Sequence, residues 1–140
     1  MNYVIKAYSE LPKDALDLRI TVFVDEQGFV DEVDEFDSVA THLVMYENSM
    51  PIGTCRFYLK EDKETYMFGR LCFLKEYRGK SLGREMLKKV EEIVKEKGGK
   101  AIILHSQYHA KDFYIKCGFT QQGEIDYEQN KPHAWMRKDV

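Results

Sequence analysis

Hydrophobic and polar positions follow two different periods at the start of the chain. The stretch from Asn2 to Tyr8 is short and rich in residues that favour strands. From Pro12 to about Gln27, apolar residues recur at helical spacing, and Gly28 follows. Proline suits the first turn of a helix and glycine its end. The pattern therefore predicts a strand followed by an amphipathic helix.

The middle of the chain predicts an antiparallel meander. Three apolar runs cover residues 41–46, 51–60 and 65–74. Turn residues at 48–51 and a charged turn at 61–64 separate them. Links this short join neighbouring antiparallel strands, so the three runs are expected to lie side by side.

The second half predicts a helix, a buried strand, a short helix and a final hairpin. Residues 82–97 carry an apolar stripe and stop at two glycines, and residues 101–104 are wholly apolar, as in a buried parallel strand. A short helix at 110–116 and strands at 119–125 and 134–137 complete the pattern. No repeat or linker divides the chain, so one domain over residues 1–140 is expected. The stripe consists of Leu82, Met86, Leu87, Val90, Ile93 and Val94.

Composition excludes several classes of protein. The 140 residues carry a net charge of −3, which argues against nucleic acid as the main partner. No apolar run approaches the ~20 residues that cross a bilayer, and the N-terminus lacks the features of a secretory signal. Three separated cysteines, Cys55, Cys72 and Cys117, are typical of reduced thiols in a cytoplasmic protein. Neither they nor the four histidines have metal-ligand spacing, so no metal is expected.

A basic glycine loop, Arg78 to Gly83, lies between an apolar run and the long helix. Its two glycines allow a sharp turn, and the first N–H groups of a helix attract anions. Arg78, Lys80 and Arg84 add positive charge, so the loop predicts a pyrophosphate site. An ordinary strand-to-helix turn is the alternative. A Walker A loop is excluded because Leu74 stands where its first glycine belongs, and a dinucleotide fingerprint needs a third glycine.

An acidic run extends from Asp25 to Asp37, with seven carboxylates and no basic residue. A charge run is commonly a solvated loop. It can also form the mouth of a site that attracts an amine-bearing substrate. The run by itself leaves both interpretations open.

The order of predicted elements, together with two motifs, resembles the GNAT superfamily of N-acetyltransferases. The loop of that family reads Q/R-x-x-G-x-G/A. Arg78 and Gly83 match its ends, while Ser81 replaces the middle glycine. The second motif, N-x-x-A-x-x-x-Y with a following lysine and Gly-Phe pair, is matched at Gln107, Ala110, Tyr114, Lys116 and Gly118-Phe119, with glutamine in place of asparagine. A narrower similarity to a bacterial branch rests on Leu18-Arg19, Val22-Phe23, Glu26-Gln27, Glu35, Asp37, Gly69-Arg70 and His133.

The resemblance implies a mixed α/β fold, in which a mostly antiparallel twisted sheet is flanked by helices and splays between its fourth and fifth strands. Acetyl-CoA, the co-substrate, would lie in that gap. Strand amides would hold its pantetheine arm, and the loop its pyrophosphate. The implied cofactor-binding residues are Cys72, Phe73, Leu74, Arg78, Gly79, Lys80, Ser81, Leu82, Gly83, Arg84, Gln107 and Tyr114.

The resemblance also implies direct attack of an amine on the thioester through a tetrahedral intermediate. A strand amide near Cys72 or Phe73 would stabilise the oxyanion. Tyr114 would protonate the departing thiolate, since a phenol of pKa ~10 suits a thiol of pKa ~8.5. A core aromatic is the alternative role for Tyr114. The candidate bases are Glu26, Glu35, Asp37, His42 and His105. His105 is the best placed of them, with a structural role as its alternative.

On the acceptor side, the expected substrate residues are Glu26, Glu35, Asp37, Arg70 and His133. Arg70 lies within an apolar run, so it must face a pocket or pair with an acid of the Asp31–Asp37 segment. The predicted function is acetyl transfer to a primary amine of a small molecule, and a homodimer is compatible with it. Two alternatives stay open: a non-catalytic acyl-CoA sensor on the same fold, and an interaction module that binds no CoA.

Overall fold

The computed structural model describes residues 2–30 and 33–140. Within these residues, seven strands form one mixed sheet in the order β1-β2-β3-β4-β5-β7-β6. The chain divides into two compact units: Met1–Tyr58 with Arg70–Val90, and Leu59–Gly69 with Glu91–Val140. The expectation of a single domain stays a prediction.

The first unit holds the antiparallel start of the sheet. β1 (Tyr3–Tyr8) pairs with β2 (Thr41–Glu47), which pairs with β3 (Met50–Leu59). Between β2 and β3, Asn48 and Ser49 both have positive φ, 48° and 71°. Two such residues make the tight turn that matches the twist of a hairpin. The strand therefore begins at Met50, one residue before the predicted start.

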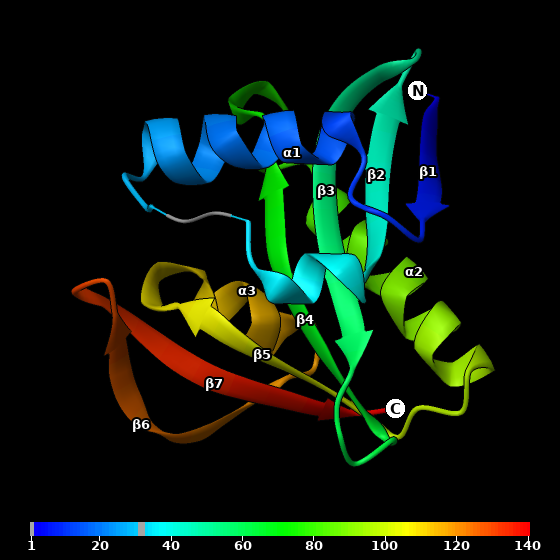
Figure 1. Ribbon diagram of the computed structural model, residues 1–140. Coiled ribbons are helices and arrows are strands. Elements are labelled where there is room, and N and C mark those ends of the chain that lie inside the picture. Colours follow the sequence, from blue (N-terminus) through cyan, green and yellow to red (C-terminus); the bar gives the residue numbers. More distant parts are fainter. Residues whose placement is uncertain (1, 31–32) are drawn as a thin grey trace. The chain divides into compact units, whose positions relative to one another are not determined.

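One apolar face of the predicted first helix packs on these strands (Figure 1). It is an α-helix, α1 (Lys13–Arg19), that continues as a π-helix, η1 (Ile20–Glu26), rather than one regular helix. The Gln27 amide donates to the Val22 carbonyl, five residues back, at 3.2 Å. Gly28 then ends the element at φ +76°. The buried cluster beneath it includes Ala15, Leu18, Val22, Phe23, Phe29, Val44, Tyr46 and Cys72.

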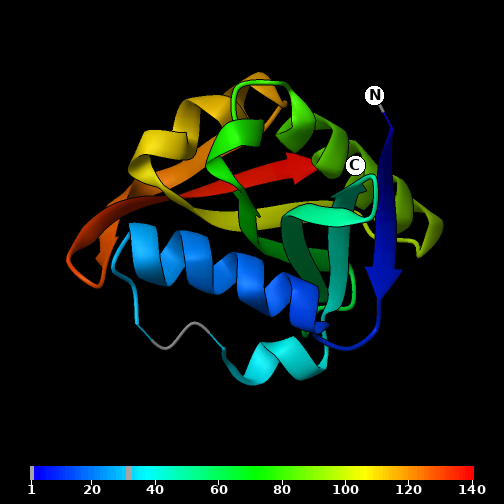
Figure 2. The same ribbon diagram turned by 90° about the horizontal axis from the view of Figure 1, so that it is seen from above.

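The segment after this helix, for which a solvated loop was one interpretation, contains a 3₁₀-helix, η2 (Glu35–Ser38), which lies beside α1 (Figure 2). Asp34 begins it with a capping box, in which its side chain and that of Asp37 each accept a backbone N–H. Asp31 and Glu32 of the predicted acidic run lie outside the described residues.

β4 (Thr65–Phe73) leads to the loop and to α2 (Leu82–Glu96), with a short 3₁₀-helix, η3 (Lys75–Tyr77), between them. The predicted stripe of α2 is confirmed, since all its members are buried except Ile93, which is half-buried. Within β4, Arg70 has φ +54°, a left-handed conformation that is uncommon outside glycine.

The second unit contains β5 (Ala101–Gln107), β6 (Thr120–Glu128) and β7 (Lys131–Asp139), with β7 between the other two (Figure 1). The short helices η4 (Tyr108–Ala110) and α3 (Lys111–Lys116) follow β5. The predicted parallel strand is confirmed: Thr65–Phe68 of β4 pairs with Ala101–Leu104. The final hairpin is longer than predicted because a bulge at Gly123, φ +76°, lets β6 continue.

The cysteines are free thiols, with Cys55 and Cys72 buried and Cys117 half-buried. Burial raises the pKa of the Cys55 thiol well above its ordinary value. In the described part of the chain, no helix combines the length and the apolar character that crossing a bilayer requires.

Candidate active site

The loop before α2 has the backbone shape of an anion site. Gly79 has φ +77° and Ser81 has φ +63°. Ser81 thus adopts the conformation that the missing glycine of the motif would supply, at a cost of roughly 1–2 kcal/mol for an L-residue. Its carbonyl accepts the Glu85 amide at 3.3 Å and starts α2. The amides of the first turn therefore gather at the loop, where a phosphate can bind.

The end of β4 offers fewer amides than the resemblance implied. The Leu74 N–H donates to the Ile52 carbonyl at 2.9 Å, so it is committed to β3. Because successive residues of a strand point their N–H and C=O groups to opposite edges, Cys72 faces β3 as well and Phe73 faces the other edge. The Phe73 ring fills the space beside Gly53, where an added Cβ would come within 2.3 Å of it. Of the three predicted pantetheine amides, the one that faces away from β3 is that of Phe73.

The basic side chains of the loop already have partners. Arg78 donates from Nε to the Phe73 carbonyl at 3.0 Å, and its Nη2 contacts both carboxylate oxygens of Glu26. The Lys80 ammonium lies over the Tyr77 ring, 5.4 Å from its centroid. The Tyr77 hydroxyl donates to Glu47 at 2.6 Å, and this bond raises the pKa of Tyr77 to about 12.

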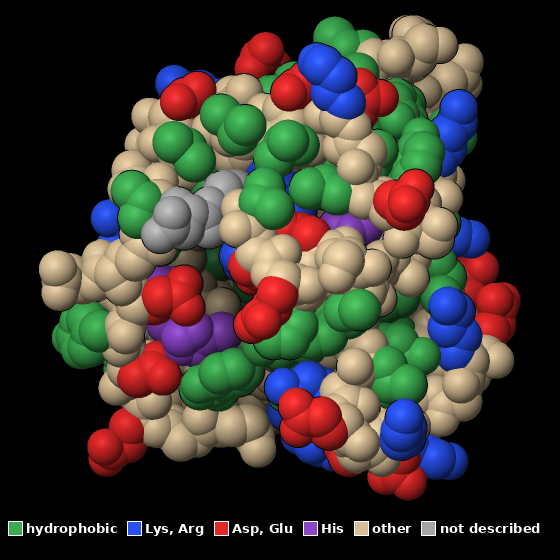
Figure 3. Space-filling view, viewed as in Figure 1, with side chains coloured by type: hydrophobic (Ala, Val, Ile, Leu, Met, Phe, Trp, Pro, Cys, Tyr) green, Lys and Arg blue, Asp and Glu red, His purple; other side chains and the backbone are tan. Residues whose placement is uncertain are grey.

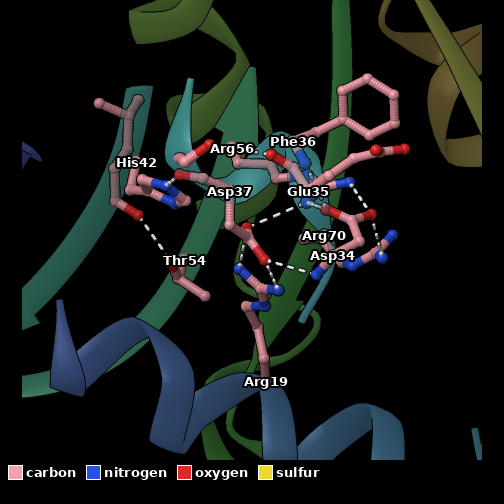
Figure 4. A network of polar contacts seen from close by, with 11 residues as sticks. Arg19, Asp34, Glu35, Phe36, Asp37, His42, Thr54, Arg56 and Arg70 are labelled. Carbon is pink, nitrogen blue, oxygen red and sulfur yellow. Dashed lines mark hydrogen bonds and ion pairs between the residues drawn. The ribbon is translucent and has the colours of Figure 1, made fainter. Parts of the chain in front are cut away.

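A network of arginines and aspartates joins η2 to three other elements (Figure 4). Arg19 of α1 donates to both carboxylate oxygens of Asp37, at 2.8 and 3.0 Å. Arg56 of β3 donates to Asp37 and also to Asp34. Arg70 of β4 donates to Asp34 at 3.1 Å, the second of the two alternatives predicted for this arginine.

The network shifts the pKa values of the ionisable groups at its centre. Burial acts to raise the pKa of Asp37, but the hydrogen bonds from Arg19, the Asp34 amide and Arg56 outweigh it and hold that pKa well below its usual range. Burial lowers the pKa of His42, whose Nε2 donates to the Asp37 carbonyl at 2.9 Å. The Asp37 carboxylate is therefore charged, and the imidazole of His42 is neutral near pH 7.

This geometry revises the prediction for Asp37. Its side chain is 5% exposed and is held by two arginines, so neither a solvated loop nor the mouth of a substrate site describes it. Glu35, its neighbour on η2, is exposed. Glu26 is exposed too, although it is paired with Arg78.

In the second unit, His105 of β5 is enclosed by aromatic rings and carboxylates. Its ring stacks on Trp135, with 4.5 Å between centroids, and on His133, with 4.7 Å. Its Nε2 is 2.7 Å from Asp126 and its Nδ1 is 3.4 Å from Glu128. Figure 3 shows histidine and acidic side chains together at the surface. The bond from His105 lowers the pKa of Asp126.

These contacts determine how protons are arranged on His105. A carboxylate only accepts, so Nε2 carries the hydrogen that binds Asp126, and in the neutral ring Nδ1 keeps the lone pair. His133, by contrast, is buried and donates from Nδ1 to the Lys131 carbonyl at 2.9 Å. Asp126 thus holds the hydrogen on Nε2, and Nδ1 lies on the side of Glu128, 3.4 Å from its carboxylate.

Of the other predicted residues, Gln107 is the last residue of β5 and Tyr114 lies in α3. Tyr114 of α3 is buried, and its ring makes edge-to-face contacts with Phe68, Phe113 and Phe119. The side-chain oxygen of Gln107 accepts from His109 Nε2 at 2.9 Å. Among the described residues, no group of three or more His, Cys, Asp or Glu could hold a metal ion.

Sequence reasoning missed several residues of the arginine–aspartate network and of the group of side chains around His105. Arg56 could have been found, because it lies in an apolar run just as Arg70 does and a buried arginine requires a partner. Asp34 could have been found as well, because its spacing from the predicted residue Asp37 is that of a capping box. Asp126 and Glu128 had no signal, since they reach His105 only through the pairing of β6 with β7.

Comparison with known proteins agrees with this architecture. A family model described as an acetyltransferase (GNAT) domain matches residues 13–140. The chain belongs to the GNAT acetyltransferase family. Among relatives of this GNAT chain is the uncharacterized N-acetyltransferase YjcF of Bacillus subtilis. It is 32% identical over an alignment of 142 positions, which covers 99% of this chain and all of YjcF.

Solved structures show the same fold. That of Escherichia coli ElaA superposes with a TM-score of 0.84 at 26% identity, over 98% of each chain. A GNAT family acetyltransferase from Elizabethkingia anophelis, solved with acetyl-CoA bound, has a TM-score of 0.79 at 16% identity over 99% of each chain. The predicted family and fold class are confirmed.

Proposed function

We propose that this protein transfers the acetyl group of acetyl-CoA to a primary amine of a small molecule. The observation that carries the proposal is the loop that opens α2, where Gly79 and Ser81 both have left-handed backbone conformations. The family motif has glycine at this position, and Ser81 adopts a glycine-like conformation at φ +63°. This conformation is well explained by a loop whose amides must converge on a phosphate.

The donor groups of the loop fit a CoA pyrophosphate. They are the amides of residues 79–84 and the cations of Lys80 and Arg84, a donor set suited to two adjacent phosphates. The Phe73 amide, which faces away from β3, is the proposed donor to the acyl arm and to the developing oxyanion. The thioester supplies an activated acyl group, and these residues bind and orient it.

Two side chains of the second unit are proposed to handle protons. Tyr114 would donate the hydroxyl proton to the leaving thiolate. His105 would accept the amine proton at Nδ1, with Asp126 holding the Nε2–H tautomer. Glu26, Glu35, Arg70 and His133 stay proposed acceptor-side residues. For Asp37 we propose a different role, which is to hold η2 against α1 and β3. The free thiols fit a reducing, cytoplasmic setting.

Thioester turnover with a panel of small primary amines tests the proposal, with free CoA thiol measured by a colour reagent and the product by mass. Tyr114→Phe should lower turnover by about 10²-fold while acetyl-CoA affinity stays unchanged. Tyr108→Phe, at an exposed tyrosine near the same helix, is the matched control and should keep full turnover.

The outcomes separate the functions. Binding of CoA without turnover of any amine would favour a sensor over an enzyme. No binding of CoA at all would leave an interaction module as the remaining interpretation.

A further inference from the structure

The Arg78 side chain connects three parts of the first unit. It starts in the loop, and its Nε reaches back to the carbonyl of Phe73 at the end of β4. Its Nη2 lies 2.9 and 3.1 Å from the two carboxylate oxygens of Glu26, the last residue of η1. The pair is within reach of solvent, since the Arg78 and Glu26 side chains are 42% and 35% exposed.

Both groups that Arg78 contacts have other uses in the proposed reaction. Phe73 turns its N–H and C=O toward the edge of β4 that β3 leaves open, because the Leu74 amide is bonded to β3. At that edge, the Arg78 side chain donates a hydrogen bond to the Phe73 carbonyl. Glu26 in turn places a carboxylate beside the loop at which a pyrophosphate is proposed to bind. A carboxylate and a phosphate compete for the same guanidinium.

We propose that Glu26 is an internal competitor of acetyl-CoA, holding Arg78 until the phosphate oxygens of the cofactor take its place. This inference rests on the proposed function. When Arg78 changes partner, the Glu26 carboxylate is released and becomes available to the ammonium group of the acceptor. Binding of acetyl-CoA therefore raises the affinity for a cationic acceptor that binds Glu26. By thermodynamic reciprocity, the acceptor raises the affinity for acetyl-CoA by the same factor. Glu26 therefore couples the affinities of the two substrates.

The expected effect is modest because the ion pair is partly exposed and screened by salt. Pairs of this kind contribute little, so removing the competitor should tighten CoA binding by about two- to fivefold. The gain should shrink at high ionic strength.

The test is a double-mutant cycle on the full chain, with CoA as the titrant in calorimetry at low salt. Its members are wild type, Glu26→Gln, Arg78→Gln and the double variant. Asp25→Asn is the matched control, because Asp25 is an exposed acid one residue away and its loss changes the net charge equally. Circular dichroism verifies that each variant is folded.

The inference predicts that Glu26→Gln tightens CoA binding in the wild-type background, that it has no effect when Arg78 is already glutamine, and that Asp25→Asn changes little. Weaker or unchanged binding in Glu26→Gln would overturn it, and so would an equal gain in the Arg78→Gln background or in Asp25→Asn. In those cases wild type still binds CoA, so the proposed function stands. If wild type bound no CoA, both would fail.

Discussion

The first unit contains one acidic segment and one basic segment, and their side chains make different kinds of contact. The acidic run, residues 25–37, turns Asp34 and Asp37 toward three arginines contributed by α1, β3 and β4. In the basic loop, residues 78–84, Arg78 pairs with Glu26, and that pair is half-exposed. The aspartates that pair with buried arginines stabilise the fold, whereas a charged group that remains exposed to solvent can be reached by a ligand.

The difference lies in the partners and not in the runs themselves. Arg19 and Arg56 are buried, and a buried guanidinium is tolerated only with a matched carboxylate. η2 brings such carboxylates to them. At the loop, by contrast, Arg78 and its partner Glu26 both remain within reach of solvent. Four changes should break or sharpen this contrast.

The largest effect is expected from Asp37→Asn. It removes the charged partner that Arg19 has in Asp37 and one of the two that Arg56 has, since Arg56 keeps Asp34, so the free energy of unfolding should fall by about 3–5 kcal/mol. Urea unfolding followed by circular dichroism measures the loss. Glu35→Gln, which removes an exposed carboxylate of the same 3₁₀-helix, is the control and should change stability by less than ~0.5 kcal/mol. Equal losses in both variants would mean that the network does not hold η2.

A second prediction concerns pH. The pKa of His42 is lowered by burial and that of Asp37 by its arginines, so both groups bind fewer protons in the folded protein than in the unfolded chain. Their contributions to stability are complete above the unfolded values. They decline as pH falls below about 6.5 for His42 and below about 3.9 for Asp37. Urea unfolding over this range should show both declines in wild type. The lower decline should be smaller in the Asp37→Asn variant but still present, because the pKa values of Asp34 and Asp126 are lowered too.

The third prediction concerns the loop before α2, which the Gly83→Asp variant tests. A carboxylate in the first turn of α2 repels a pyrophosphate at the adjoining amides, so CoA affinity should fall by about 10²-fold while the protein stays folded. Calorimetry with CoA measures the loss. Gly83→Ala adds a side chain without charge, is allowed by the family pattern, and should bind CoA nearly as well as wild type. Full affinity in the aspartate variant would falsify the assignment of the loop.

The smallest effect is expected at Ser81. Glycine adopts φ +63° without the steric penalty of a Cβ, so Ser81→Gly should raise the free energy of unfolding by about 1 kcal/mol and leave CoA affinity close to that of wild type. Ser81→Ala keeps the penalty and removes the hydroxyl. If both variants weaken CoA binding, the hydroxyl itself contacts a phosphate.

Much of the fold could be predicted because it depends on local patterns. The stripe of α2, the meander and the parallel strand at 101–104 follow from periodicity and from turn residues, and the structure confirms them. The π-helical half of the first helix could not be predicted, because a shift of hydrogen bonds from four residues to five leaves the apolar face almost unchanged. The end of β5 was missed for a similar reason, since His105 and Gln107 are polar and become strand residues only by pairing with β7.

The candidate site divides in the same way. The sequence alone determined the loop, because glycines, basic residues and a helix start are contiguous there and the amides that bind an anion belong to neighbouring residues. Only the tertiary structure decided which partners the acidic side chains have. Asp37 lies 18 residues from Arg19 and 19 from Arg56, and Asp126 lies 21 from His105. A carboxylate's charge depends on what the fold brings within about 3 Å of it, and that neighbour is not encoded in the residues beside it.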